Sequence, residues 1–170
     1  MGELKVEQLK IQDTPTQDYH AVTKEYFEDN VSASYSVCRA KFRKDNGIAA
    51  GQSEVPMYED SGHFENVLVN GEHRLIKTSI RLTAARTAGT LTMHISKNGS
   101  KITSSTALEL TIDGTHPQEN WAEISNITNY EFDDGDKWGI MLTTDGSWDQ
   151  TTASIEVECY YEVNIDPITP

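Results

Sequence analysis

The sequence predicts an all-β protein: an antiparallel β-sandwich that follows an N-terminal extended arm with one short helix. Two observations lead to this prediction. Residues 35–170 contain about eight short runs in which apolar and polar residues alternate, and turn signals separate the runs. Residues 1–34 lack that pattern and end in a segment with helical spacing. We therefore expect two parts, an attachment arm over residues 1–34 and a sandwich over residues 35–170.

The last third of the chain has the clearest strand pattern. Every second residue from Ala153 to Val163 is apolar or aromatic, and most of the residues between them are acidic. Such alternation indicates a strand with one buried face, because successive side chains of a strand point to opposite faces. Another β-rich run covers residues 137–144, and Asp145-Gly146-Ser147 is turn chemistry between the two. The pattern predicts a long antiparallel hairpin whose apolar face is covered by a second sheet.

Residues 4–11 carry apolar side chains with strand-like spacing and a one-residue slip, which is consistent with a bulge or with an arm laid along another surface. Pro15 interrupts this run. From Asp18 the spacing becomes helical, and Asn30 is a suitable end for a short helix, which needs a surface to pack on. The partner-binding residues that we expect in the arm are Leu4, Val6, Leu9, Ile11, Tyr19, Val22 and Tyr26.

The first half of the sandwich begins with a strand over residues 35–42, which places Cys38, Ala40 and Phe42 on one face. A short strand over residues 64–69 precedes Asn70-Gly71, a strong hairpin signal. In the following run, the alternation puts Ile76, Thr78, Ile80 and Leu82 on one side and Lys77, Ser79 and Arg81 on the other.

The second half of the sandwich resumes after Ala88-Gly89 with alternation over residues 91–95. This alternation places His94 on the wet face of its strand. Lys97-Asn98-Gly99 predicts a tight turn, and apolar residues then recur up to Ile112. An eighth, less regular element is expected over residues 121–132.

Composition and charge exclude several functions. The chain has 14 Lys and Arg against 27 Asp and Glu, a net charge of −13, which argues against binding to nucleic acids or anionic membranes. No stretch approaches the roughly 20 apolar residues of a membrane span, and the N-terminus lacks the apolar core of a signal peptide. We expect synthesis and assembly in a cytoplasm, and a thin core from the apolar content of 36%.

No motif in the chain indicates catalysis. The five histidines show no metal-ligand spacing, and neither a G-x-S-x-G motif nor a phosphate-binding glycine loop is present. Asp133-Asp134-Gly135-Asp136 lacks the spacing of an EF-hand loop and is better explained as a tight turn, with a calcium ion as the alternative. Cys38 and Cys159 are expected to be reduced and buried. The sequence thus predicts no enzyme and no cofactor.

Two surface features suggest binding. Trp148 stands in a polar turn, where it either folds onto the end of the sandwich or offers a stacking platform for a sugar or a contact for a neighbouring chain. Residues 109–136 contain no Lys or Arg, which indicates a solvated rim or an outward face of a particle. The acids of this stretch are Glu109, Asp113, Glu119, Glu123, Glu131, Asp133, Asp134 and Asp136.

Two resemblances sharpen these predictions. The segment TPTQDYHAVTKEYFEDNV, residues 14–31, resembles a short element of tailed-bacteriophage fibre and appendage proteins that lies near the virion-attachment end and helps three chains meet. The runs LTMHISKNGS, residues 91–100, and FDDGDKWGIML, residues 132–142, resemble the jelly rolls of the C1q and tumour-necrosis-factor type, which are usually trimers. They favour a jelly roll over an immunoglobulin-like sandwich.

Together these resemblances imply a non-enzymatic structural protein of a tailed-phage virion. The short chain favours a trimeric capsid decoration (cement) protein or short head fibre that attaches through its arm. A tail-fibre or receptor-binding subunit and a sugar-binding module are the alternatives. The implied partners are two further copies of the chain, other virion proteins such as the major capsid protein, and a host surface glycan.

Overall fold

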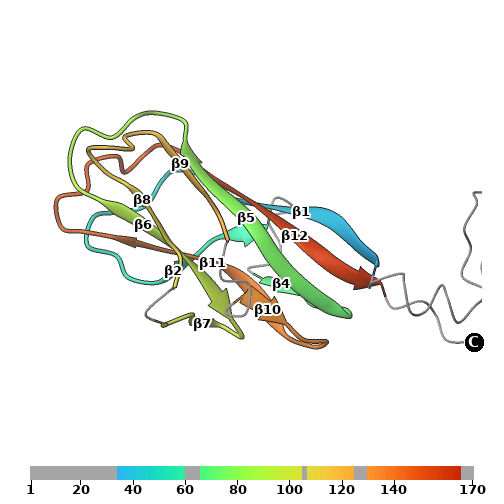
Figure 1. The fold of residues 1–170 in the computed structure, drawn as a ribbon. Coiled ribbons are helices and arrows are strands. Elements are labelled where there is room, and N and C mark those ends of the chain that lie inside the picture. The colour runs from blue at the N-terminus through green and yellow to red at the C-terminus, as the bar shows by residue number, and fades with distance from the viewer. Residues whose placement is uncertain (1–33, 60–65, 105–106, 125–129, 166–170) are drawn as a thin grey trace, which may run out of the picture. The chain divides into compact units, whose positions relative to one another are not determined.

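The computed structural model describes residues 34–59, 66–104, 107–124 and 130–165. These residues form twelve strands and no α-helix, so among them no helix is long and apolar enough to cross a membrane (Figure 1). The expected arm and helix over residues 1–33 lie outside the described residues. The first six strands are β1 (Ser34–Lys44), β2 (Val55–Pro56), β3 (Tyr58–Glu59), β4 (Asn66–Leu68), β5 (Glu72–Leu82) and β6 (Leu91–Lys97). The others are β7 (Ser100–Lys101), β8 (Glu109–Ile112), β9 (Glu119–Glu123), β10 (Glu131–Phe132), β11 (Lys137–Thr144) and β12 (Ile155–Ile165).

The strands form two antiparallel sheets with jelly-roll connectivity (Figure 1). In the first, sheet A, the order is β3-β1-β12-β5, and β9 and β10 both pair with β5. In the second, sheet B, β2 and β4 pair with one side of β11, and the order continues through β6 to β7 and β8. Each sheet therefore interleaves strands from the two halves of the chain, and the first strand lies beside the last. This interleaving distinguishes a jelly roll from a simple meander, and the predicted fold class is confirmed.

Two of the predicted hairpins are wrong. Strands β11 and β12 belong to different sheets, and the Asp145 turn begins a crossing from sheet B to sheet A. Asn70-Gly71 likewise connects β4 in sheet B to β5 in sheet A, with Gly71 at φ +85°. Local alternation fixes which side chains are buried but leaves the pairing partner open, and long-range pairing decided it here.

The turn at Asn98-Gly99 behaves as predicted. Lys97 pairs with Ser100 across it, and both turn residues have positive φ, +52° for Asn98 and +80° for Gly99. Such a two-residue turn matches the twist of the flanking strands. The element expected over residues 121–132 is divided into β9 and β10, which pair with different parts of β5.

The core lies between the inner faces of the two sheets. Trp138 of β11 is fully buried, and its ring centroid lies 5.8 Å from that of Phe42 on β1. Thr78 Oγ1 of β5 lies 3.9 Å from Met93 Sδ of β6. The predicted alternation of the last strand is confirmed from Ala153 to Cys159, where every second residue is buried. Buried apolar side chains contribute about 1.5–3 kcal/mol each, so this cluster holds the two sheets together.

Candidate functional site

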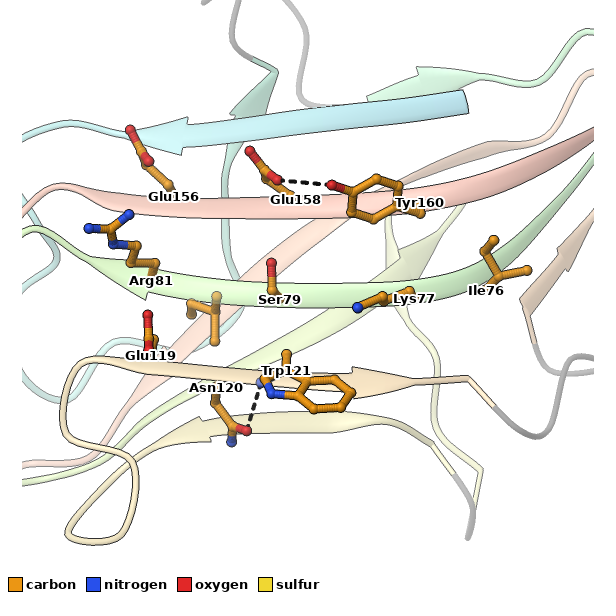
Figure 2. A pocket seen from close by; sticks show the side chains of 11 residues that line it. Ile76, Lys77, Ser79, Arg81, Glu119, Asn120, Trp121, Glu156, Glu158 and Tyr160 are labelled. Carbon is orange, nitrogen blue, oxygen red and sulfur yellow. Dashed lines mark hydrogen bonds between the residues drawn. The ribbon is translucent and has the colours of Figure 1, made fainter. Parts of the chain in front are cut away.

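The outer face of sheet A carries an open groove that we call the Ser79 groove. Its volume is about 600 Å³, within the range of small-molecule sites (Figure 2). Its lining residues come from β5, β9 and β12 and are Ile76, Lys77, Ser79, Ile80, Arg81, Glu119, Asn120, Trp121, Glu156, Glu158 and Tyr160.

Strand register explains why the face is hollow at this point. Ser79 of β5 lies directly opposite Trp121 of β9 on one side and opposite Glu158 of β12 on the other. Side chains of directly paired residues stand next to each other on the same face. A small residue between two larger ones therefore leaves a depression with Ser79 at its floor and Trp121 and Glu158 as its walls (Figure 2).

A β-bulge shapes one end of the groove. Tyr160 pairs with Lys77, but the next residue, Tyr161, pairs with Leu75, so Ile76 is an extra residue in β5. The prediction that Ile76 lies on the same side of the strand as Thr78 and Ile80 is therefore wrong, because a bulge shifts the alternation by one residue. Ile76 is half-buried and lines the groove instead.

Charges on this face form stripes of alternating sign from strand to strand. The basic cluster on β1 contacts the acids of β12: Lys41 lies 3.8 Å and Arg43 3.5 Å from Glu156, and Arg39 lies 3.8 Å from Glu158. These pairs are partly exposed, so each contributes only weakly to the stability of the fold. The β1 cations contact Glu156 and Glu158 of β12 from one side, so these two carboxylates are oriented before any ligand binds.

Arg81 lies at one end of the floor, between Glu156 and Glu119 of the flanking strands (Figure 2). Within the described part of the chain, neither Arg81 nor Glu119 makes an ion pair or a side-chain hydrogen bond. Tyr160 Oη donates a 3.5 Å hydrogen bond to Glu158, two residues earlier on the same strand, β12. The groove thus combines a donor, Arg81, with acceptors whose hydrogen-bonding capacity is only partly used.

Trp121 forms the other wall and is 61% exposed. The Lys77 ammonium lies 4.9 Å from the centre of its ring, a cation–π contact that restrains the indole without burying it. From the sequence, Trp121 follows a polar loop and could be either buried or exposed. The available signal was its alternation with Asn120 and Ala122, which places it on the same face as two acids, Glu119 and Glu123.

Asn120 protects the free edge of β9. Its Oδ1 accepts a 2.8 Å hydrogen bond from the Trp121 amide, and its Nδ2 donates a 2.9 Å hydrogen bond to the Thr111 carbonyl on β8. An exposed edge strand would otherwise offer unpaired amides to another strand. The Asn120 side chain therefore occupies the Trp121 amide, which a partner strand would otherwise have to pair with.

Trp148, the residue predicted to contact a sugar or a neighbouring chain, is only 3% exposed. Gly89 packs against its backbone so closely that an added Cβ would lie 2.3 Å from the Trp148 Cα and N atoms. Asp149 accepts hydrogen bonds from the Thr87 amide and hydroxyl, which ties the two loops together. The alternative in which Trp148 folds onto the sandwich end is the one that the structure supports, and its ring has no face open to a sugar.

His94 is buried, so its predicted solvated position is wrong. It is 5% exposed because β6 is a central strand, with β11 on one side and β8 on the other. Burial is the largest cause of the lowered pKa of His94; Lys101 lowers it further, while Glu109 and Glu54 oppose the shift. Its Nδ1 lies 3.2 Å from Glu109.

The segment Asp133–Asp136 forms a tight turn. Asp136 accepts hydrogen bonds from the Asp133 amide at 2.9 Å and from Asn98 Nδ2 at 2.8 Å, and it lies 2.7 Å from Lys97 Nζ. The Lys97 and Asn98 hydrogen bonds lower the pKa of Asp136 to about 2. Asp134 in turn accepts a hydrogen bond from the Gly71 amide. Within the described ranges, no group of three or more His, Cys, Asp or Glu side chains is placed to hold a metal ion.

Of the two cysteines predicted to be reduced and buried, only Cys159 is fully buried. Cys38 is half-buried and Cys159 fully buried, both as free thiols, and burial raises the pKa of Cys159 to about 12. Within residues 109–136, most of the acids are exposed. The partner-binding residues expected in the arm lie outside the described residues, and these are Leu4, Val6, Leu9, Ile11, Tyr19, Val22 and Tyr26.

No protein-family model and no curated protein matches the sequence. Among solved structures, it is similar to a chain of the acidic stable capsid of Helicobacter pylori bacteriophage KHP30, with 9% identity, 78% of this chain and 92% of that chain covered, and a TM-score of 0.48. It is also similar to a chain of the cyanophage Pam1 capsid asymmetric unit, with 12% identity, coverage of 89% and 98%, and a TM-score of 0.44. A chain of Desmodium yellow mottle tymovirus is similar too, with 11% identity, 100% of this chain and 99% of that chain covered, and a TM-score of 0.34. Likenesses at this level carry no argument about function.

Proposed function

We propose that this protein is a non-enzymatic structural protein of a tailed-phage virion, a trimeric capsid decoration protein or short head fibre. The observation that carries the proposal is the jelly-roll connectivity, with β1 next to β12 and strands of both chain halves interleaved in each sheet. Viral capsid proteins and lectins commonly use this architecture. The Ser79 groove, with its exposed indole and oriented charges, supports a role in binding another molecule.

The attachment role rests on the segment over residues 14–31, with its resemblance to phage appendage proteins. In this proposal, residues 1–34 bind a neighbouring virion protein such as the major capsid protein. The apolar residues of the arm are too few for a core of their own, but they are enough to hold register on a partner surface. Three arms per trimer would add avidity wherever the three sites are within reach.

Imaging of labelled protein on intact particles tests the location. Electron microscopy with an affinity label on the C-terminus should place the label on the capsid surface. A label at the tail would favour the tail-fibre or receptor-binding subunit instead, and absence of label from particles would contradict both.

A truncated variant tests the attachment. Removal of residues 1–33 leaves β1 intact, so circular dichroism should stay β-rich and melting cooperative while binding to particles disappears. A truncated protein that still decorates particles would contradict the role of the arm, and one that fails to fold would contradict the predicted division of the chain.

The trimer is tested by light scattering on the full-length protein at micromolar concentration. The expected mass is three times the chain mass of 19.0 kDa. A monomer at every concentration would remove the trimer from the proposal while leaving the particle imaging to decide the rest.

A further inference from the structure

We propose that the Ser79 groove binds a short, neutral oligosaccharide. This inference stands on the groove alone and holds on whichever particle surface the protein resides. The floor runs along β5 over the five residues from Lys77 to Arg81, four rises or roughly 13 Å, which gives room for more than one sugar ring.

Trp121 supplies the stacking wall. Its indole is 61% exposed and is restrained by the Lys77 cation–π contact, and its backbone amide donates a hydrogen bond to Asn120. A preoriented aromatic ring beside a depression binds the apolar face of a sugar at little entropic cost. Ser79, directly opposite in register, leaves the space that the ring of the sugar would occupy.

The polar walls match hydroxyl groups. Arg81 is a donor and Glu119 an acceptor, and neither has an ion pair or a side-chain hydrogen bond among the residues described here. Glu158 adds a second acceptor, held in place by Arg39 and Tyr160. Since a sugar hydroxyl both donates and accepts, one ligand would satisfy all three groups. The lining holds three carboxylates against two cations, so a neutral sugar fits better than an acidic one.

Other occupants fit less well. Five of the eleven lining side chains are charged, whereas the cores of protein interfaces are depleted of charge because burying it is costly. A β-strand from a partner would need the β9 edge, where Asn120 already occupies the Trp121 amide. A nucleic acid would meet a chain with a net charge of −13.

The distribution of tryptophans gives a site-specific assay. Of the three in the chain, Trp138 and Trp148 are buried and only Trp121 is exposed, so acrylamide should quench the fluorescence of Trp121 selectively. An array of neutral oligosaccharides of hexoses and N-acetylhexosamines identifies ligands, with sialylated and uronate-containing oligosaccharides beside them. We expect a neutral ligand to protect Trp121 from the quencher at millimolar concentration or below.

Calorimetry on variants then assigns the site. Trp121→Ala should weaken binding by about 10-fold or more, as expected for the loss of one stacking platform. Ser79→Leu should abolish binding by filling the floor. Leu68→Ala, a control at a 62% exposed position on sheet B, should bind like the parent protein.

Four results would overturn the inference. One is the absence of any neutral ligand that protects Trp121, and another is binding to acidic oligosaccharides alone. The third is protection of Trp121 by increasing protein concentration without sugar, which would make the groove a contact between copies of the chain. A ligand whose affinity is unchanged in Trp121→Ala and Ser79→Leu would likewise place its site elsewhere.

Discussion

Trp148 and Trp121 have similar sequence surroundings, since each follows a polar segment and has acidic residues nearby. In the fold they are opposites, because Trp148 is 3% exposed at the loop end of the sandwich and Trp121 is 61% exposed on its outer face. Trp148 is buried by residues far away in the sequence, above all the loop that carries Gly89. The comparison separates two uses of one side chain, stabilisation of the fold and presentation to a ligand.

The largest loss of stability is expected from Trp148→Ala. Removal of a buried indole leaves a cavity and should lower the free energy of unfolding by about 3–5 kcal/mol. Trp148→Phe should cost less, because the buried Nε1 of Trp148 has no hydrogen-bond partner among the described residues to lose. Chemical denaturation of both variants measures this. Equal stability of the alanine variant and the parent protein would show that the loop end contributes little to the fold.

Gly89→Ala tests the contact between Gly89 and Trp148 from the loop that carries Gly89. Gly89 has φ +76°, and its added Cβ would lie 2.3 Å from the backbone of Trp148, so the two loops must separate. We expect a loss of about 2–4 kcal/mol from overpacking and the left-handed conformation together. Gly99→Ala is the matched control, because Gly99 has φ +80° but open space around it, and it should lose only about 1–2 kcal/mol. Equal losses would mean that contact with Trp148 is unimportant.

His94 extends the comparison to the outer face of sheet B, where a polar residue is buried. Its folded pKa is lowered, mainly by burial, so the unfolded chain binds a proton at higher pH than the native protein. The contribution of His94 to the free energy of unfolding is therefore fully present above the pKa of about 6.5 that it has in the unfolded chain. This contribution is lost as the pH falls toward the folded pKa. Burial also lowers the pKa of His73, which adds to the effect.

Denaturant midpoints at pH 7.5 and pH 5.5 measure the effect. The parent protein should lose stability toward pH 5.5, and His94→Gln should lose less, because only His73 of the two buried histidines in the described ranges then titrates. An unchanged pH dependence in His94→Gln would contradict the assignment. The turn carboxylate of Asp136, with a pKa of about 2, does not contribute in this window.

Sequence alone predicted the sandwich, the Asn98-Gly99 turn and the buried face of the last strand. These features depend on local alternation and turn chemistry, which are readable over a few residues. It failed for the two hairpins expected at Asp145-Gly146-Ser147 and at Asn70-Gly71, for the bulge at Ile76 and for the burial of His94. Each of these depends on which distant strand lies alongside, and a single sequence does not encode that in any local pattern.

The Ser79 groove shows the same limit for function. Its walls come from β9 and β12 and its floor from β5, so its three segments are more than 30 positions apart in the chain and meet only through the sheet order. Trp148 attracted the sugar-binding prediction because a turn usually lies at the surface. Trp121 did not, because its strand was expected to be part of an irregular element.

The smallest effect on stability is expected from Trp121→Ala, the substitution that should matter most for binding. The side chain is exposed, so its removal costs little buried area, and the main loss is the cation–π contact with Lys77, about 0.5–1 kcal/mol. Lys77→Met removes the positive charge but keeps the aliphatic part of the side chain. If the cation–π contact accounts for the whole loss of stability in Trp121→Ala, then adding Lys77→Met to that variant should lower the free energy of unfolding no further. Denaturation of the two single variants and the double variant closes this cycle. A loss for Trp121→Ala as large as that for Trp148→Ala would mean that Trp121 supports the fold, and the distinction between the two tryptophans would then fail.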